Sequence, residues 1–462
     1  MRGKGIVAVL IVTAVFAAVS QAAQQRNWGL KVSDNGRFLV HTDGTPFFYL
    51  GDTAWELFHR LTLQESAVYL DDRAKNGYTV IQAVVLAELD GLNVPNAEGE
   101  KPLLNNDPEK INEAYFRHVD KVVEMARERG LYVAMLPTWG DKVVKAPWSE
   151  AGQLIFTPEK ARAYGRIVGR RYRNQPNIIW VLGGDRDPSG VETVWREMAA
   201  GIKEGDGGRH LMTFHPVGGH SSADKFHADT WLDFNMRQNG HAPQSQSRSW
   251  EKITADYARV PVKPVIDAEP LYEDHPLAFN AKELGYSFDA HVRQYAYADI
   301  FAGACGFTYG NHAVWQMYGP NRTPVNGPLM YWYEAIHRPG ATQMRFVRAL
   351  LESRPYLSRV PDQSIVVDPL DGADHVSATR GDGYLFVYSA QGRKFTVRAG
   401  KLSANRLKGW WFNPRTGNAQ CIGELENAEK EFVPPSEGFG SDWVLVLDDA
   451  SRSFPAPGTL RE

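Results

Sequence analysis

Two acidic residues stand at positions suited to acid–base chemistry. Asp185 ends the segment Trp180-Val-Leu-Gly-Gly-Asp185, and Glu269 ends the segment Pro264-Val-Ile-Asp-Ala-Glu269. Each follows a short apolar run of the kind that forms a buried strand. Glycoside hydrolysis needs two carboxyl groups that flank the scissile bond, about 5–5.5 Å apart for retention and about 6.5–9.5 Å apart for inversion. The sequence therefore predicts Asp185 and Glu269 as a catalytic pair.

Structural roles compete with this interpretation. Asp185 could cap a helix that we expect over residues 188–203, and Asp187, directly before Pro188, is better explained as such a cap. Glu269 could form an ion pair with a neighbouring Arg or Lys. The occurrence of both carboxyl groups directly after predicted strands favours catalysis.

Polar and aromatic residues follow the other predicted strands as well. Amides and imidazoles bind sugar hydroxyls, and a Trp ring covers the apolar face of a sugar. The expected substrate-binding residues are Asp52, Trp55, Gln82, Trp139, His215, Gln238 and Trp315. His215 and His220 could instead bind a metal, although contacts with hydroxyl groups explain them better. Glu88 and Asp90 fit a solvated loop equally well.

The sequence predicts neither a metal nor a cofactor. Only two cysteines occur, Cys305 and Cys421, which are too few for a zinc site and which we expect to be buried free thiols. We find no Gly-rich phosphate loop and no G-x-S-x-G motif, which disfavours nucleotide binding and a serine nucleophile.

The site residues need a scaffold that gathers the ends of many strands. β-Branched apolar runs alternate with helical patterns over about 320 residues, which is typical of an α/β fold of the (β/α)8 TIM-barrel type. The expected strands are Pro46–Gly51, Tyr78–Val85, Leu131–Pro137, Ile178–Gly183, His210–His215, Trp231–Met236, Pro264–Ala268 and Gly306–Tyr309. An open doubly wound sheet is the main alternative, but it normally carries a Gly-rich loop.

Helix start signals and turn signals mark the expected boundaries. A capping box at Thr62–Glu65, Asp107-Pro108-Glu109 and Thr157-Pro158-Glu159 predict helix starts. The last barrel helix should cover Tyr331–Ser353. Asp34-Asn35-Gly36 and Asp43-Gly44 predict two hairpin turns that precede the barrel.

The last hundred residues have a different pattern. Short apolar segments are separated by Gly, Asp and Asn turns, as in a small antiparallel β-sandwich. We therefore expect a barrel over residues 28–355 and a C-terminal β-sandwich over residues 360–450, which should be structural and dock on the barrel.

The motifs resemble a known family. The segment Tyr49-Leu-Gly-Asp52-Thr-Ala-Trp55-Glu-Leu-Phe58 and the two segments that end in Asp185 and Glu269 are similar to the apiosidase-like glycoside hydrolases of family 140. Trp411-Phe-Asn413-Pro414-Arg415-Thr416-Gly417 resembles their small C-terminal domain, which carries a collagen-binding label.

This resemblance implies a barrel followed by a β-sandwich. It also implies hydrolysis of a β-linked furanosyl unit, typically apiose on the pectin rhamnogalacturonan II, with Asp185 as acid/base and Glu269 as nucleophile. Retention is favoured because the placement of these two residues after the fourth and seventh predicted strands resembles that in retaining barrel hydrolases. Related barrel hydrolases often carry an Asn-Glu pair where this chain has Gly184-Asp185. That difference agrees with the apiosidase-like pattern.

Composition narrows the class of partner. The 462 residues carry a formal charge of −3, which argues against nucleic-acid binding and fits an oligo- or polysaccharide substrate. Residues 1–22 have the order of a signal peptide, with Arg2 and Lys4 before an apolar run and Ser20-Gln21-Ala22 at the cleavage position. We therefore expect a periplasmic or secreted protein without a membrane anchor.

Alternatives from other classes remain. A glycosidase of the same barrel type could act on another plant or algal polysaccharide. A non-catalytic glycan- or collagen-binding protein would explain the C-terminal label, although the Trp pair and the Asn-Pro turn also suit a sandwich core. A metal-dependent hydrolase would need a His/Asp ligand set at the strand ends.

The export hypothesis has a direct test. The mature protein should begin near Ala23, because the small residues up to Ala22 suit signal peptidase. N-terminal sequencing of protein from the native host checks this, and a mature chain that still begins at Met1 would contradict it.

Overall fold

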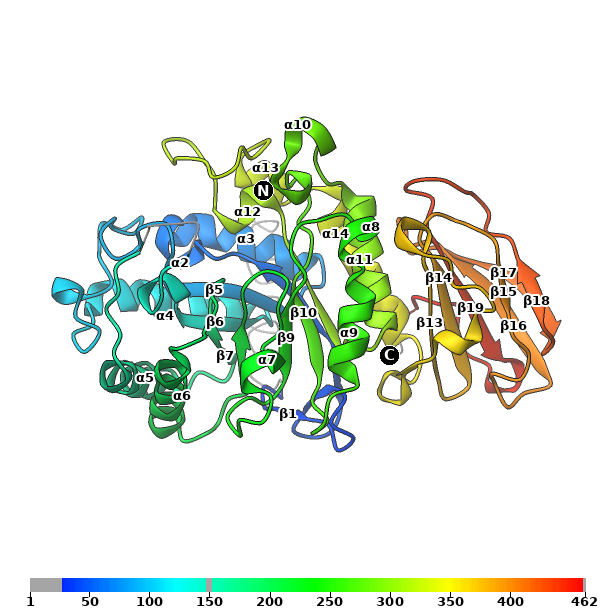
Figure 1. Ribbon diagram of the computed structural model, residues 1–462, viewed down its shortest axis with the longest axis horizontal. Coiled ribbons are helices and arrows are strands. Elements are labelled where there is room, and N and C mark those ends of the chain that lie inside the picture. Colours follow the sequence, from blue (N-terminus) through cyan, green and yellow to red (C-terminus); the bar gives the residue numbers. More distant parts are fainter. Residues whose placement is uncertain (1–26, 147–151, 460–462) are drawn as a thin grey trace, which may run out of the picture.

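The computed structural model describes residues 27–146 and 152–459, and the predicted signal peptide lies outside these ranges. A barrel with helices around it occupies one side of the molecule, and a β-sandwich packs against its outer helices (Figure 1). The predicted fold class is confirmed. Among the described residues, no helix is long and apolar enough to cross a membrane.

Eight parallel strands form the barrel. Their hydrogen-bonded order is β8-β7-β6-β5-β4-β11-β10-β9. The ring closes between β8 and β9, where the Asp233 N–H donates to the Met212 carbonyl at 2.8 Å and the Thr213 hydroxyl donates to the Phe234 carbonyl at 2.6 Å. The strands are β4 (Tyr49–Thr53), β5 (Val80–Leu86), β6 (Tyr132–Thr138), β7 (Ile178–Gly183), β8 (Met212–His215), β9 (Asn235–Gln238), β10 (Val265–Glu269) and β11 (Gly306–Tyr309).

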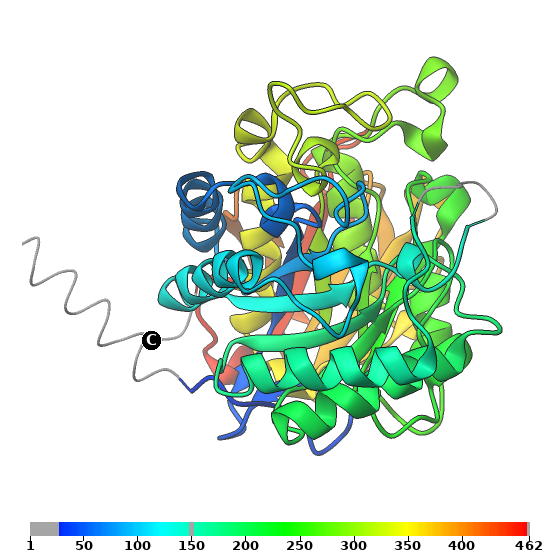
Figure 2. The ribbon, with the colours of Figure 1, turned by 90° about the vertical axis from the view of Figure 1, so that its left-hand side faces the viewer.

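Helices cover the outside of these strands, and Figure 2 shows the barrel from the side away from the sandwich. The longer ones are α3 (Leu63–Lys75), α4 (Glu113–Glu128), α5 (Pro158–Tyr172), α6 (Glu192–Asp206), α9 (Ser249–Tyr257), α11 (Asp289–Phe301) and α14 (Pro339–Glu352). Single-turn helices are α2 (Leu57–Arg60), α7 (Ala223–Phe226), α8 (Gln244–Ser247), α10 (Ala281–Leu284), α12 (His312–Trp315) and α13 (Trp332–Ala335).

Local capping chemistry explains several helix boundaries. The predicted capping box is present at α3, where Thr62 and Glu65 accept from each other's backbone N–H groups, and Thr157 caps α5 as expected. The prediction at Asp107 was wrong: α4 begins at Glu113 with Asn112 as its cap. The Asp107 carboxylate instead accepts from the Glu109 N–H and pairs with Lys110, which closes a turn.

Three further predicted boundaries were wrong. The predicted helix Tyr331–Ser353 is divided into α13 and α14, because Arg338 before Pro339 is extended, with φ −62° and ψ 151°. The predicted helix over residues 188–203 begins only at Glu192 with Val191 at its N-cap, so the prediction that Asp187 caps this helix was wrong. The predicted strand Pro46–Gly51 is also divided: β1 (Leu30–Val32), β2 (Leu39–His41) and β3 (Pro46–Phe47) form a small antiparallel sheet before β4.

The C-terminal sandwich consists of a six-stranded and a two-stranded antiparallel sheet. The larger sheet has the order β12-β13-β14-β19-β16-β17, and β15 pairs with β18. The strands of the two sheets together are β12 (Val360–Pro361), β13 (Val376–Gly381), β14 (Tyr384–Ser389), β15 (Phe395–Val397), β16 (Arg406–Phe412), β17 (Ala419–Glu426), β18 (Lys430–Phe432) and β19 (Trp443–Asp449). Cys305 before β11 is buried as expected, whereas Cys421 on the outer strand β17 is exposed, and both are free.

The central sandwich strands are buried on both faces. On β14, Tyr384, Phe386 and Tyr388 join the core of the barrel helices, whereas Leu385 and Val387 join the core of the sandwich. This alternation follows from the two-residue period of a strand. The sandwich therefore covers the barrel with an apolar face.

Buried ion pairs complete the contact between barrel and sandwich. The Arg293 guanidinium on α11 lies 2.9 Å from the Asp442 carboxylate, and Arg354 lies 2.8 Å from Asp448. Tyr297 stacks on Tyr388, with ring centres 4.8 Å apart. In the segment Trp411–Gly417, which resembles the domain with the collagen-binding label, Trp411 is buried in the sandwich and Asn413 closes a turn. This agrees with the interpretation of the segment as part of a sandwich core.

Removal of Asp442 tests this docking. Asp442→Ala should lower the free energy of unfolding by about 3 kcal/mol, because it leaves the buried Arg293 charge without its main partner. Urea unfolding measures the effect, with Asp382→Ala at the exposed Arg452 pair as the control that should change little. A chain truncated at residue 359 that kept its melting temperature and activity would show that the sandwich is dispensable.

Candidate active site

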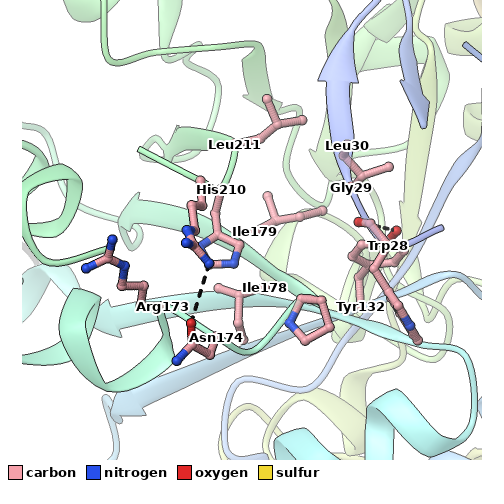
Figure 3. A pocket seen from close by; sticks show the side chains of 12 residues that line it. Trp28, Gly29, Leu30, Tyr132, Arg173, Asn174, Ile178, Ile179, His210 and Leu211 are labelled. Carbon is pink, nitrogen blue, oxygen red and sulfur yellow. Dashed lines mark hydrogen bonds between the residues drawn. The ribbon is translucent and has the colours of Figure 1, made fainter. Parts of the chain in front are cut away.

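A cavity of about 810 Å³ opens at the carboxyl ends of the barrel strands. Its lining comes from most of the strand ends and comprises Trp55, Glu88, Leu89, Trp139, Asp141, Asp185, Arg186, Val217, Gly218, Gln238, Gly240, His241, Glu269, Tyr272, His275, Phe279, His312, Trp315, Val325 and Asn326. A smaller cavity of about 240 Å³ lies at the opposite ends of the strands, between Trp28, Tyr132 and Ile178 (Figure 3). Barrel enzymes carry their chemistry at the carboxyl ends, which selects the larger cavity.

The turn after β7 directs Asp185 into this cavity. Gly183, Gly184 and Asp185 have φ values of 90°, 115° and 51°, all in the left-handed region. A Cβ atom at residue 183 would lie 2.2 Å from the His215 carbonyl oxygen, and one at residue 184 would lie 2.6 Å from the Trp139 ring. Only glycine fits at these two positions. The Gly-Gly pair is therefore required for the sharp turn that presents the Asp185 carboxyl group.

Glu269 ends β10 and is only 6% exposed. Its Oε1 accepts a hydrogen bond from the Gln238 amide at 2.9 Å and lies 3.2 Å from Nε2 of His241. Its Oε2 lies 3.2 Å from Nε2 of His215. A register shift between Asp267 and Glu269, where β10 pairs with β9, interrupts the strand just before this side chain. Such bulges turn a side chain away from the regular alternation of a strand.

The pKa values of the two carboxyl groups are shifted in opposite directions. Burial and the nearby Glu269 charge raise the pKa of Asp185 to about 6, against the opposing influence of Arg186, His215 and Gln238. Burial alone would also raise the pKa of Glu269, but hydrogen bonds and charge interactions with His215 and His241 lower it to about 2. Between these values Asp185 is protonated and Glu269 is ionised, a combination that can act as an acid and a nucleophile.

Aromatic rings enclose the space beside this pair. The ring centre of Trp55 lies 5.2 Å from that of Trp139 and 5.1 Å from that of His215. Both Trp side chains are 2% exposed. Trp315 lines the cavity further round and donates from its indole N–H to Nδ1 of His312 at 3.3 Å. The structure thus brings Trp55, Trp139, Gln238 and Trp315 to the cavity that Asp185 and Glu269 line. His215 is fully buried behind this lining and contacts Glu269 instead.

Two expected substrate ligands lie elsewhere. Asp52 points outward from β4 to helix α3, where it accepts from the Tyr69 hydroxyl and lies 3.3 Å from Arg73. Gln82 lies inside the barrel below the cavity and donates to the Ala268 carbonyl at 3.0 Å. Both are fully buried, so the predicted sugar contacts of Asp52 and Gln82 are corrected to structural roles. Alternation along β4 turns Asp52 away from the barrel interior, because neighbouring residues of a strand face opposite sides. Gln82 faces inward but lies too deep to reach a substrate.

The other acidic and histidine candidates, Asp187 and His220, make local contacts. The Asp187 carboxylate accepts from the Ser189 backbone and hydroxyl, and these hydrogen bonds lower its pKa, so it caps a turn. His220 is exposed and pairs with Asp224 at 3.4 Å. Among the residues that the structure describes, no cluster of three or more His, Cys, Asp or Glu side chains suits a metal ion.

Several residues that line the cavity were not among the predicted site residues. Glu88 lines the cavity, and burial together with Glu56, Asp185 and Asp141 raises its pKa well above the usual value. His241 contacts Glu269, and its ring stacks on His275 at 4.0 Å. The position of His241 shortly after the sixth predicted strand could have indicated that it belongs to the site. His275 lies in the long loop after β10, where no local pattern marks it.

Comparisons with known proteins agree with this site. Residues 33–358 match the family model of the apiosidase-like catalytic domain, and residues 360–448 match the "Putative collagen-binding domain of a collagenase". A solved "Glycoside hydrolase" shares 35% identity at a TM-score of 0.86, over 93% of this chain and 98% of that one. A glycoside hydrolase family 5 structure from Bacteroides vulgatus ATCC 8482 shares 33% identity at a TM-score of 0.87, over 94% and 96%.

Curated relatives are more distant. Mannan endo-1,4-beta-mannosidase 3 of Oryza sativa subsp. japonica is 28% identical over 228 residues, which are 40% of this chain and 48% of the relative. The chain thus spans about half the length of the curated relatives it matches. The family model covers most of the chain, and two solved glycoside hydrolases match nearly all of it, so the chain belongs to the apiosidase-like family and is a glycoside hydrolase.

Proposed function

We propose that this enzyme is a retaining glycosidase that cleaves a furanosyl, apiosyl-type linkage in plant cell-wall pectin such as rhamnogalacturonan II. The observation that carries the mechanism is the carboxyl pair in one cavity, with the pKa of Asp185 raised and that of Glu269 lowered. The apiosidase-like family match supports the choice of sugar. The signal-like N-terminus supports action outside the cytoplasm.

In the first step, the Glu269 carboxylate attacks the anomeric carbon while the Asp185 carboxyl group gives its proton to the departing oxygen. A covalent glycosyl ester on Glu269 forms, and Asp185 is left ionised. In the second step, Asp185 removes a proton from a water molecule, and the water oxygen displaces Glu269 from the sugar. His215, His241 and Gln238 hold the Glu269 oxygens before attack and receive the carboxylate again at the end.

A β-mannan is the second candidate substrate, favoured by the similarity to the rice mannosidases. A screen of the purified enzyme on pectic side chains, synthetic furanosides and mannan oligosaccharides, with products read by mass spectrometry, separates the two. Release of apiose supports the proposal, whereas release of mannose overturns the choice of sugar. Binding without hydrolysis of any glycan would favour a non-catalytic role.

Substitution of the two carboxyl groups tests their roles. Glu269→Gln should lose nearly all activity on every substrate, because the covalent step needs the carboxylate. Asp185→Asn should lose about 10²–10⁴-fold on a natural glycan but far less on a substrate with a good leaving group. Asn tolerates the left-handed backbone at residue 185, so this variant should fold.

Azide then separates the mechanisms. Added azide should rescue Asp185→Asn and give a β-glycosyl azide, because a small anion needs no base to attack the glycosyl enzyme. An azide product of inverted configuration would exclude retention. Asp187→Asn is the matched control and should keep wild-type activity, since Asp187 only closes a turn. A dead Asp187→Asn beside an active Asp185→Asn would reverse the assignment.

The pH dependence of kcat/KM follows from the pKa shifts of Asp185 and Glu269. kcat/KM should stay high between the pKa of Glu269, about 2, and that of Asp185, about 6, as far as the fold survives acid. Above pH 6 the activity should fall about tenfold per pH unit, because the protonated fraction of Asp185 falls. Asp185→Asn, assayed on a substrate with a good leaving group, should lose this alkaline limb. An unchanged limb in the variant would assign it to another group.

A further inference from the structure

Phe279 is an exposed aromatic side chain at the rim of the catalytic cavity. It lines the cavity and is nevertheless 64% exposed, whereas Trp55 and Trp139 at the enclosed end are 2% exposed. It lies in the long connection between β10 and α11, next to helix α10, which Figure 1 shows at the top of the barrel. Burial of Phe279 in the core therefore does not explain its presence.

The backbone is strained in order to hold this ring. Ala278 and Phe279 have φ values of 51° and 59°, in the left-handed region that is unfavourable for residues with a side chain. The Ala278 N–H donates to the His241 carbonyl at 2.8 Å, and the Phe279 N–H donates to the Pro276 carbonyl at 3.0 Å. The neighbouring Leu277 is buried and anchors the turn. Strain maintained at a cavity rim is a sign of function rather than of packing.

The neighbours of Phe279 connect it to the nucleophile. Its ring stands nearly perpendicular to His275, with centres 4.8 Å apart and planes at 86°, and lies 5.6 Å from His241. His241 in turn lies 3.2 Å from the Glu269 carboxylate. One imidazole thus contacts both the Glu269 carboxylate and Phe279, which places the exposed ring within one side chain of the carboxylate that flanks the scissile bond.

The two ends of the cavity suit different parts of a substrate. The sugar whose anomeric carbon reacts must fit between Asp185 and Glu269, beside the enclosed rings of Trp55 and Trp139. The leaving group has to point towards solvent, where Phe279 is exposed. An aromatic ring at such a position binds the apolar face of a sugar, because burial of that face is favourable and the hydroxyl groups stay in water.

We propose that Phe279 is the stacking platform for the sugar on the leaving-group side of the scissile bond. The inference rests on the proposed roles of Asp185 and Glu269. It implies that this enzyme distinguishes substrates by whether the cleaved unit is attached to another sugar ring.

The test compares two leaving groups on the same reacting sugar. One substrate is an oligosaccharide that carries a further sugar on the leaving-group side, and the other is the β-glycosyl fluoride, whose leaving group is too small to reach Phe279. Phe279→Ala should lower kcat/KM roughly tenfold on the oligosaccharide, equivalent to about 1.4 kcal/mol, and leave the fluoride reaction unchanged. Phe279→Trp should retain activity on both.

Phe279→Gly separates function from stability. Glycine relieves the left-handed strain, so this variant should melt at the same or a higher temperature while it loses activity on the oligosaccharide. Phe439→Ala removes another exposed aromatic side chain, 55% exposed and outside the cavity, and is the control that should behave like wild type.

The failures of the two proposals are distinguishable. Equal losses on oligosaccharide and fluoride, or wild-type activity of Phe279→Ala and Phe279→Gly on the oligosaccharide, would overturn the stacking role. A wild-type enzyme inactive on apiosides would overturn the proposed substrate instead. The comparison then uses the glycan that the substrate screen identifies and the fluoride of its terminal sugar, with the same expected contrast.

Discussion

The ionised carboxylate of Glu269 is the constraint on which the site depends. A buried charge is costly unless neighbouring groups replace the water that it loses. Here the replacements come from separate parts of the barrel: His215 at the end of β8, Gln238 at the end of β9, and His241 shortly after it. The charge that they stabilise also helps to keep the proton on Asp185. The ionisation states of Asp185 and Glu269 therefore depend on each other electrostatically.

Location, rather than a raised pKa alone, distinguishes Asp185, the proposed catalytic acid, from other buried acids. Burial also raises the pKa of Asp52 to about 6 and that of Glu273 to about 7. Both of these groups lie outside the cavity and hydrogen-bond to tyrosine hydroxyls, Asp52 to Tyr69 and Glu273 to Tyr309. Asp185 differs because three consecutive left-handed residues turn it into the cavity. Backbone geometry thus separates Asp185 from the acids that lie outside the cavity.

The C-terminal sandwich supports the same part of the barrel. Its aromatic face and the pair between Arg293 and Asp442 hold α11, the helix that follows the β10 loop. That loop carries His275 and Phe279 and begins directly after Glu269. The loop is therefore bounded by a barrel strand at one end and by a helix clamped to the sandwich at the other. A strained turn inside such a loop persists when its surroundings are rigid.

Much of this organisation follows from local sequence. Alternation of apolar runs with helical patterns indicates the barrel, and Asp185 and Glu269 are recognisable because each directly follows a predicted strand. Thr62 and Thr157 cap their helices as expected, since a cap involves only residues three or four apart. Boundaries that depend on a competing turn, as at Asp107 and Pro339, were placed wrongly.

Tertiary structure alone decided which polar residues face the cavity. Asp52 and Trp55 are three residues apart, yet one packs against α3 and the other lines the cavity. Gln82 points into the barrel but too deep to reach a substrate. His241, His275 and Phe279 meet Glu269 or each other only through folding of a long loop. Sequence by itself determines strands, caps and the order of candidate residues, because these depend on near neighbours. The direction and depth of each side chain depend on barrel closure, the β10 bulge and loop packing, which join residues far apart in the chain.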